Sequence, residues 1–273
     1  MAVTHAGTSP RSSQGFWSGM SKQSRITWTR LAIFVALLIL WEIYGQTLAN
    51  PRLISGPSAI VHALFTEILP DSQIVAAIGQ SFWEVILAYV LSIIIGIGLG
   101  LAIGWGNFTR RSFYPIVLLL YAIPQVILLP LFVLIFGIGP ACKIAFGVSH
   151  GFFPILVNVI AGMRNVNPLY LRSAKSMGGT SLDIARHVYF PHMVPSLFTG
   201  LRLGMTMTLL GVILAELYVS TQGIGYWTKV FAETFDPAPL FALIVILALM
   251  AIILNELVRV AERRFTRWRT QQH

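Results

Sequence analysis

Polar and ionisable side chains interrupt a chain that is otherwise strongly apolar. Of its 273 residues, 56% are hydrophobic and only 11% are charged. Inside apolar runs that could enter a membrane, a polar side chain is costly and commonly faces a cavity, a solute pathway or a polar partner. A proline there leaves backbone carbonyls without their hydrogen-bond donors, and these carbonyls also need protein or a water-filled cavity around them. The candidates for lining a pathway are Pro124, Gln125, His150, Thr206 and Glu216.

Simpler interpretations compete with a pathway for several of these side chains. For Thr206, and for Asn158 in another run, hydrogen bonding between helices is the favoured interpretation. Glu216 lies near the end of its run, where it could be solvated. Glu84 also lies near a run end, and snorkelling toward water explains it most simply. His150 could titrate near neutral pH and stays a candidate for the pathway.

The sequence has none of the common signatures of a catalytic or metal-binding site. It contains no GxxxxGK[ST] phosphate loop, no HExxH and no GxSxG. Its one cysteine, Cys142, excludes an internal disulfide and a CxxC metal or redox site. We therefore expect no catalytic residue, no metal site and no cofactor bound by this chain.

A second polar group lies outside the apolar runs, in the stretch SMGGTSLDIARHVYFP at residues 176–191. Just before it, Asn167 and Pro168 predict the start of a helix, because asparagine caps the first turn and the fixed φ of proline suits the first helical position. Gly178 and Gly179 predict its end, since glycine takes the left-handed conformation that closes many helices.

A second short helix is predicted to follow directly. Thr180 with Asp183 three residues later resembles a capping box, and Pro191 predicts the end of this helix. The two helices would form an L or a V. Leu171, Ala174 and Met177 would give the pair an apolar patch, with cationic side chains beside it.

Two roles fit such a helix pair equally well from composition alone. A small apolar patch beside cations suits docking into a groove on a cytoplasmic partner. The same helices could instead lie on the bilayer with their cations on anionic headgroups.

Six apolar runs approach the roughly 20 residues that cross a hydrocarbon core about 30 Å thick. So many long runs cannot all be buried in a soluble core of this size. We therefore expect six transmembrane helices, at Leu31–Leu48, Phe82–Trp105, Phe113–Phe136, Ala141–Met163, Leu201–Ser220 and Leu240–Ala261.

The net charge of +9 is interpreted as an orientation signal and not as a nucleic-acid site. Sixteen of the 19 Lys and Arg residues lie before Leu31, at Arg110–Arg111, between Arg164 and Arg202, and at the C-terminal end. With six spans these four places fall on one side, and basic loops stay cytoplasmic. The other side holds only Arg52, Lys143 and Lys229.

The second and third runs contain features that predict how they pack. Gly96, Gly100 and Gly104 lie four apart on one helix face, which allows close approach of another helix, although glycine is also simply tolerated in membranes. Pro124 and Pro130 predict a kink or break in the third run, which we therefore expect at the protein interior.

The region around the helix pair resembles the EAA motif of ABC-transporter permeases, in which E-A-A is followed by three residues, G, nine residues and I-x-L-P. Here the positions are Arg172-Ser173-Ala174, Gly178 and Val188-Tyr189-Phe190-Pro191. Longer stretches resemble the nitrate/sulfonate/taurine branch of binding-protein-dependent permeases, over roughly Asn50 to Arg269. These are SFWEVILAYVLSIIIGIGLGLAIGW, AIPQVILLPLFVLIFGIG, FFPILVNVIAGMRNVNP and PSLFTGLRLGMTMTLLGVILAELYVSTQGIGY.

The resemblance implies a type I ABC importer fold with a cytoplasmic coupling helix between spans 4 and 5. It implies a second permease copy, two ABC ATPases that bind ATP and Mg²⁺, and an extracytoplasmic solute-binding protein. Arg172 replaces the motif's glutamate and reverses its charge. The residues that would dock the ATPase are Leu171, Arg172, Ser173, Ala174, Lys175, Met177, Gly178, Gly179, Asp183 and Pro191.

The implied function is ATP-driven import of a small solute, such as a sulfonate, taurine or nitrate, across a bacterial inner membrane, with both termini cytoplasmic. A secondary carrier or channel, and a scaffold for a cytoplasmic enzyme, remain alternatives. The expected organisation is a disordered tail at 1–29, a first span at 30–49, an external segment at 50–75, a core at 76–262 with the coupling loop at 164–200, and a basic tail at 263–273.

Overall fold

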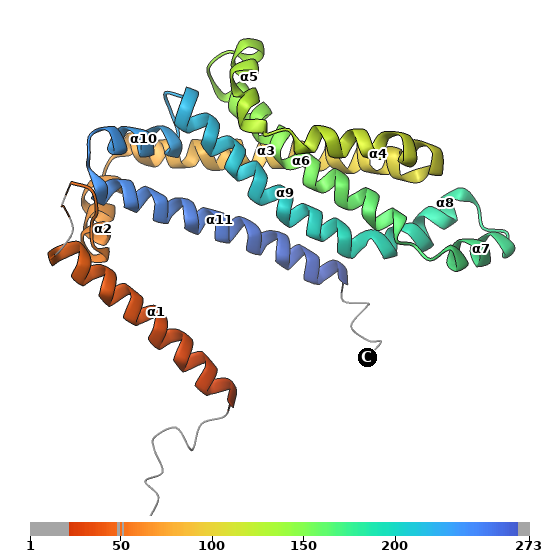
Figure 1. Ribbon diagram of the computed structural model, residues 1–273, viewed down its shortest axis with the longest axis horizontal. Helices are drawn as coiled ribbons and strands as arrows, with labels where there is room; N and C mark the ends of the chain where they lie inside the picture. The colour runs from red at the N-terminus through yellow and green to blue at the C-terminus, as the bar shows by residue number, and fades with distance from the viewer. Residues whose placement is uncertain (1–21, 48–49, 51, 267–273) are drawn as a thin grey trace, which may run out of the picture.

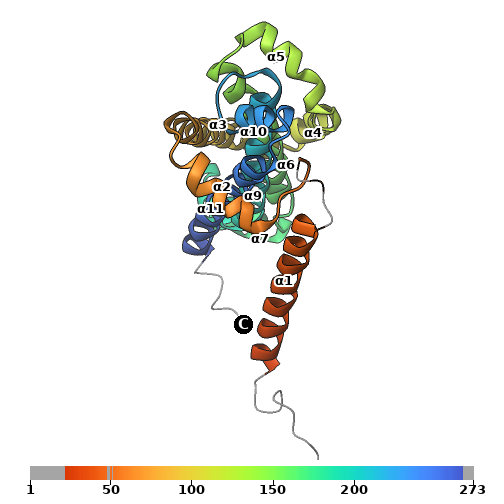
Figure 2. The same ribbon diagram turned by 90° about the vertical axis from the view of Figure 1, so that its left-hand side faces the viewer.

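The computed structural model describes residues 22–47, 50 and 52–266, almost all of them in helices joined by short connections (Figure 1). The long helices and α4 lie roughly alongside one another, while α1 and α5 extend away from them (Figures 1 and 2). The α-helices are α1 (Lys22–Thr47), α2 (Pro57–Ala63), α3 (Ser72–Trp105), α4 (Asn107–Ala122), α5 (Leu129–Phe136), α6 (Pro140–Arg164), α7 (Pro168–Ser176), α8 (Ser181–Ile184), α9 (Phe190–Val219), α10 (Ile224–Glu233) and α11 (Pro237–Thr266). π-helical turns at Leu64–Ile68 and Ala185–Tyr189 and a 3₁₀ turn at Gln125–Leu128 connect some of them.

Five of the six predicted membrane runs lie in long apolar helical stretches, and the third covers the bent α4–α5 pair. Five helical stretches are long and apolar enough to cross a membrane singly: α1, α3, α6, α11 and the continuous stretch from Ser181 to Val219. The α4–α5 pair makes a sixth span if the two bent halves are counted together. The predicted number and order of spans are therefore confirmed for the described residues by length and composition.

The centre of the molecule is formed by α3, α6 and α9, which pack closely along their lengths. A Cβ placed on Gly100 would lie 2.7 Å from Val159 on α6, and one on Gly204 would lie 2.7 Å from Ile155. Glycine therefore lets the α6 backbone approach both neighbours. Of the two interpretations of Gly96, Gly100 and Gly104, the structure favours helix packing.

The third span is broken as predicted but is not at the interior of this chain. The α4 and α5 directions differ by 80°, with Pro124 at the break. Most of the apolar side chains of α5 are exposed, including Leu134 at 82% and Ile135 at 64%. The expectation of an interior position is therefore wrong for the single chain, because α5 turns away from the bundle and leaves its apolar side chains without intrachain cover.

Several segment boundaries differ from those expected. Residues 22–29 are helical and continue into the first span, so the expected disordered tail is wrong for them, while residues 1–21 lie outside the described part. The expected external segment ends early because Asp71 caps α3, its Oδ1 accepting from Gln73 N at 2.7 Å. The helix α10 was not expected at all. The basic tail is helical to Thr266, beyond which nothing is described.

Replacing Gly100 by alanine is expected to destabilise the bundle by about 1–3 kcal/mol, since the new methyl group overlaps Val159 in a tightly packed contact. Thermal unfolding of the purified chain in detergent measures this effect. The matched control is Gly98→Ala on the same helix, where a Cβ meets nothing within 4 Å. That change should be neutral or stabilise by about 0.4–1 kcal/mol. Equal effects of both substitutions would contradict the packing role.

Candidate functional site

The first helix of the predicted pair is formed by the local signals that the sequence contains. Asn167 Oδ1 accepts from Leu169 N at 2.9 Å and caps α7. At the other end Gly178 has φ +77°, a conformation that favours glycine, and its N–H donates to Lys175 O at 3.0 Å. The predicted start and end of α7 are both confirmed.

The second helix begins as predicted but does not end as predicted. Asp183 N donates to Thr180 Oγ1 at 3.3 Å and Thr180 N donates to Asp183 Oδ2 at 3.0 Å, which completes a capping box. The expected end at Pro191 is wrong, because the helix continues through it into α9. A wider π-helical turn at Ala185–Tyr189 precedes the proline. Such turns occur inside otherwise α-helical stretches and change the pattern of backbone bonds there.

The exposed apolar surface of the pair differs in part from the expected patch. Met177 is 82% exposed, as a docking side chain would be. Leu171 and Ala174 are only partly exposed, and Leu182, which the sequence did not single out, is 77% exposed. The exposed side chains that could meet a partner are therefore Leu169, Tyr170, Arg172, Ser173, Lys175, Met177 and Leu182.

A buried ionic cluster lies at the opposite end of the bundle, where α3, α6, α9 and α10 meet. Lys143 Nζ lies 2.7 Å from Glu84 Oε2 and 3.6 Å from Glu216 Oε1. All three residues are at most 1% exposed. Buried charges of this kind persist only when opposite charges and hydrogen bonds surround them.

Hydrogen bonds from α3 and from the start of α10 complete this cluster. Ser81 Oγ donates to Glu216 Oε1 at 2.7 Å and accepts from Ile224 N at 2.8 Å. Gly225 N donates to Glu216 Oε2 at 2.9 Å. Gly223, with φ +110°, leaves the space that the Glu216 carboxylate occupies, since a Cβ there would overlap it. The Glu216 carboxylate thus fixes the turn that leads into α10.

The sequence-based interpretations of the two glutamates were wrong. Glu84 does not snorkel and Glu216 is not solvated, while Lys143, for which only a side of the membrane was predicted, is buried between them. Snorkelling and solvation describe one helix at a time, whereas here each charge is held by residues distant in the chain. One lysine and two glutamates, each near the end of an apolar run predicted to lie on the same side, were the available signal.

The other pathway candidates are brought together only in part. Ser149 Oγ lies 3.5 Å from Gln125 Oε1 and 3.3 Å from His150 Nδ1, so these residues meet where α6 passes the break in the third span. His150 is buried, whereas Pro124 is exposed. Thr206 is exposed and bonds Arg202 O of its own helix. Their roles in a pathway stay predictions. Within the described residues, no group of three or more His, Cys, Asp or Glu side chains is placed to hold a metal ion.

Comparison with protein families gives a match over most of the bundle. Residues 92–267 match the family described as "Binding-protein-dependent transport system inner membrane component". The chain is 31% identical to the formylaminopyrimidine transport permease protein ThiX of Halalkalibacterium halodurans, over 88% of this chain and 95% of that protein. It is 28% identical to the taurine transport system permease protein TauC of Escherichia coli, over 91% of each. It is 25% identical to the putative aliphatic sulfonates transport permease protein SsuC of Bacillus subtilis, over 98% of each.

Solved structures add a likeness of fold. A chain of the inward-facing MetNI methionine ABC transporter, in its native crystal form, superposes with a TM-score of 0.59, covering 71% of this chain and 95% of that one. A second crystal form, from a selenomethionine soak, gives a TM-score of 0.58. At 19% identity these likenesses concern the fold alone.

Replacing Lys143 by methionine is expected to destabilise the protein by about 3–5 kcal/mol, because two buried carboxylates then lose their only cationic partner in the described chain. Thermal or denaturant unfolding of the purified protein measures the loss. The control is Lys229→Met, whose side chain is 45% exposed and pairs with Glu233 within one helix, and whose loss should cost at most about 0.5 kcal/mol. Similar stability of both variants would contradict a structural role for the cluster.

Proposed function

Because this chain belongs to the family of inner membrane components of binding-protein-dependent transport systems, the ABC-importer permeases, we propose that it forms the membrane pathway of an ATP-driven importer of a small solute. The observation that carries this proposal is the exposed, capped pair α7–α8, joined without a helix break to the membrane-spanning α9. The expected fold class, the all-α membrane fold of a type I ABC importer, is confirmed by the likeness to MetNI.

The proposed solute is a small organic or inorganic anion, or a small heterocycle. Relatives are named for transport of taurine, of aliphatic sulfonates and of formylaminopyrimidine. A separate extracytoplasmic binding protein would select and deliver the solute, as the family's name implies. The buried charges described above are already paired, which argues against their use as a solute-binding charge.

Two ATPase subunits are proposed to dock on the α7–α8 pair. The chain has no phosphate loop of its own, so ATP and Mg²⁺ would bind the partner. Met177 and Leu182 are apolar and more than three quarters exposed, a state that favours burial in a partner's groove. Arg172 on α7 is also exposed and would pair with an acidic side chain of the ATPase.

The direct continuation of α8 into α9 supports a mechanical link between motor and membrane. A partner that moves the capped pair would move α9 as well, since one helical path runs from Ser181 to Val219. Such a partner shifts the equilibrium between states only by binding one state better than the other. ATP binding and hydrolysis in the docked subunits would supply that difference.

A second copy of this chain is proposed to cover the exposed third span. In a membrane, a broken helix persists only where protein or a water-filled cavity satisfies its freed backbone groups. The break at Pro124 and the exposed α5 have little cover within one chain (Figure 2). Pairing two chains across this region would place Gln125 and Pro124 beside a shared pathway.

The proposed location is a bacterial inner membrane, with both termini in the cytoplasm. The relatives and the several apolar helices support a multi-pass membrane protein. The orientation rests on the basic residues, because α7, Arg110 and Arg164 would all face the cytoplasm by the positive-inside rule.

Replacing both Met177 and Leu182 by glutamate is expected to abolish ATP-dependent uptake and to reduce copurification of the ATPase at least tenfold, because two charges then enter an apolar contact. The measurement combines pull-down of the partner ATPase with uptake in proteoliposomes that hold this chain, the ATPase and the solute-binding protein.

The control for this experiment is Met177→Leu, which keeps an apolar side chain and should preserve both copurification and uptake. Uptake that continues in the double variant, or that needs no ATPase, would contradict the proposed function and favour a secondary carrier. Retained ATPase binding without any uptake by the unaltered complex would favour a scaffold.

A further inference from the structure

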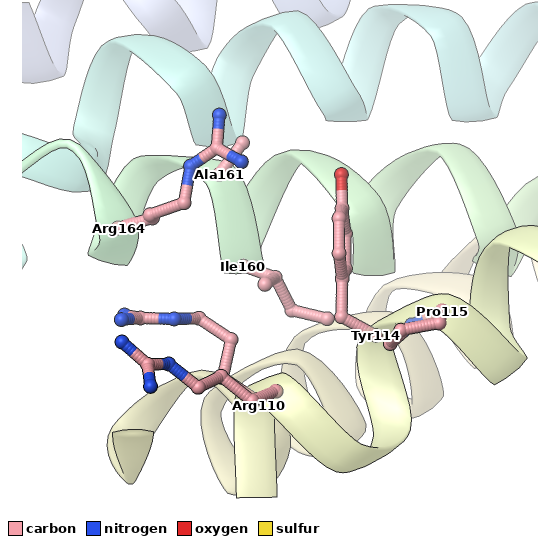
Figure 3. Close-up of a pocket in the computed structure, with 7 residues that line it drawn as sticks. Arg110, Tyr114, Pro115, Ile160, Ala161 and Arg164 are labelled. Atoms are coloured by element: carbon pink, nitrogen blue, oxygen red, sulfur yellow. The ribbon is translucent and has the colours of Figure 1, made fainter. Parts of the chain in front are cut away.

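A pocket lined by three arginines lies between α4 and α6, at the end of the bundle that carries α7 and α8. Its volume is about 270 Å³. Figure 3 shows Arg110 extending from α4 and Arg164 from α6, with the Arg164 guanidinium directed away from α4 and the Tyr114 ring rising from α4 toward α6. The pocket is lined by Arg110, Arg111, Tyr114, Pro115, Ile160, Ala161 and Arg164.

The positive charge of this pocket has no acidic counterpart in the described residues. No carboxylate there pairs with any of the three guanidinium groups, and the one hydrogen bond to them is from Arg110 Nη2 to the neutral Asn107 Oδ1, at 2.7 Å. Like charges gathered around one cavity repel, and an anion inside it would relieve that repulsion. Guanidinium groups match the oxygens of a phosphate with paired hydrogen bonds.

The walls of the pocket are apolar, and they continue along the membrane-spanning part of α4. Ile160 at the base is 1% exposed, and Tyr114 and Pro115 form the α4 side. One turn beyond Tyr114 and Pro115 on the same side of α4, Leu118 and Leu119 are exposed at 40% and 70%. A ligand with a charged head and a hydrocarbon tail would match both surfaces at once.

We propose that this pocket binds the phosphate group of an anionic phospholipid from the adjoining leaflet, with the acyl chains along the exposed face of α4. Arg110 lies in the first turn of α4 and Arg164 is the last residue of α6. The site is therefore at the ends of two spans, at the depth where headgroups lie. Basic pockets between spans bind anionic headgroups in this way.

A bound headgroup would join α4 to α6 near the start of the α7–α8 pair. The α6 helix ends at Arg164, three residues before the α7 cap at Asn167. Occupancy would thus hold the first half of the broken third span against the central bundle. This site is separate from the proposed solute pathway, so its test does not depend on which solute is carried.

The test is lipid binding to the purified full-length chain, with any subunits that copurify, by native mass spectrometry. The probes are phosphatidylglycerol, phosphatidylcholine and inorganic phosphate. Phosphatidylglycerol should bind at least tenfold more tightly than phosphatidylcholine, and inorganic phosphate should compete only weakly. Changing Arg110, Arg111 and Arg164 to glutamine should weaken phosphatidylglycerol binding on the order of 100-fold, at about fivefold for each arginine.

The matched control changes Arg259, Arg263 and Arg264 of α11 to glutamine, which removes the same charge from outside the pocket and should alter binding less than about threefold. Should the first triple variant not fold, Ala161→Leu keeps every arginine and fills the cavity, and it too should lose phosphatidylglycerol. Equal binding of the two lipids, equal loss in the control, or phosphate binding as tight as that of the lipid would overturn the proposal. The proposal would also be overturned if phosphatidylglycerol did not bind and the pocket arginines were instead required for another subunit to copurify.

Discussion

One unbroken helical path joins the exposed α7–α8 pair to the centre of the bundle, and the proposed link between a partner and the membrane depends on it. The path runs from the capping box at Thr180 to Val219 and passes through Pro191. A proline inside a helix removes one backbone bond and commonly bends the chain. Here the π-helical turn at Ala185–Tyr189 lies directly before the proline, and the helix continues. A force applied to α8 outside the membrane would therefore be transmitted along one continuous helix into the membrane.

The two ends of this path are held very differently. Between them, glycines on α9 let it lie directly against α6, so its middle cannot slide without disturbing Ile155 and its neighbours. At the far end Glu216 is bound by Lys143, Ser81 and the backbone of α10. At the near end Met177 and Leu182 are exposed. A docked partner would thus act on the exposed α7–α8 end, while buried charges hold the Glu216 end of α9 in place.

The sequence predicted the features that depend on neighbouring residues. Apolar length located the spans, because each must satisfy its own backbone in lipid. The caps at Asn167 and Thr180 were predictable because a cap is a contact between residues two or three apart. The ionic cluster was missed because Ser81 and Glu216 meet across 135 residues. The interior position expected for α5 was wrong because no other part of the same chain packs over its apolar side chains. The effect of Pro191 was misjudged because the π-helical turn before it has no clear sequence signal.

The most direct test measures whether α8 and α9 move as one body. Spin labels at Leu182→Cys and Tyr218→Cys, in a Cys142→Ala background, would lie about 54 Å apart along a straight helix. The labelled chain is diluted with unlabelled chain and assembled with its ATPase partner, so that distances within one copy are recorded with and without ATP. A distance that stays within about 2 Å between the two conditions is the predicted result. A shift of more than about 5 Å, or a second population of distances, would contradict a rigid link between the motor and the membrane.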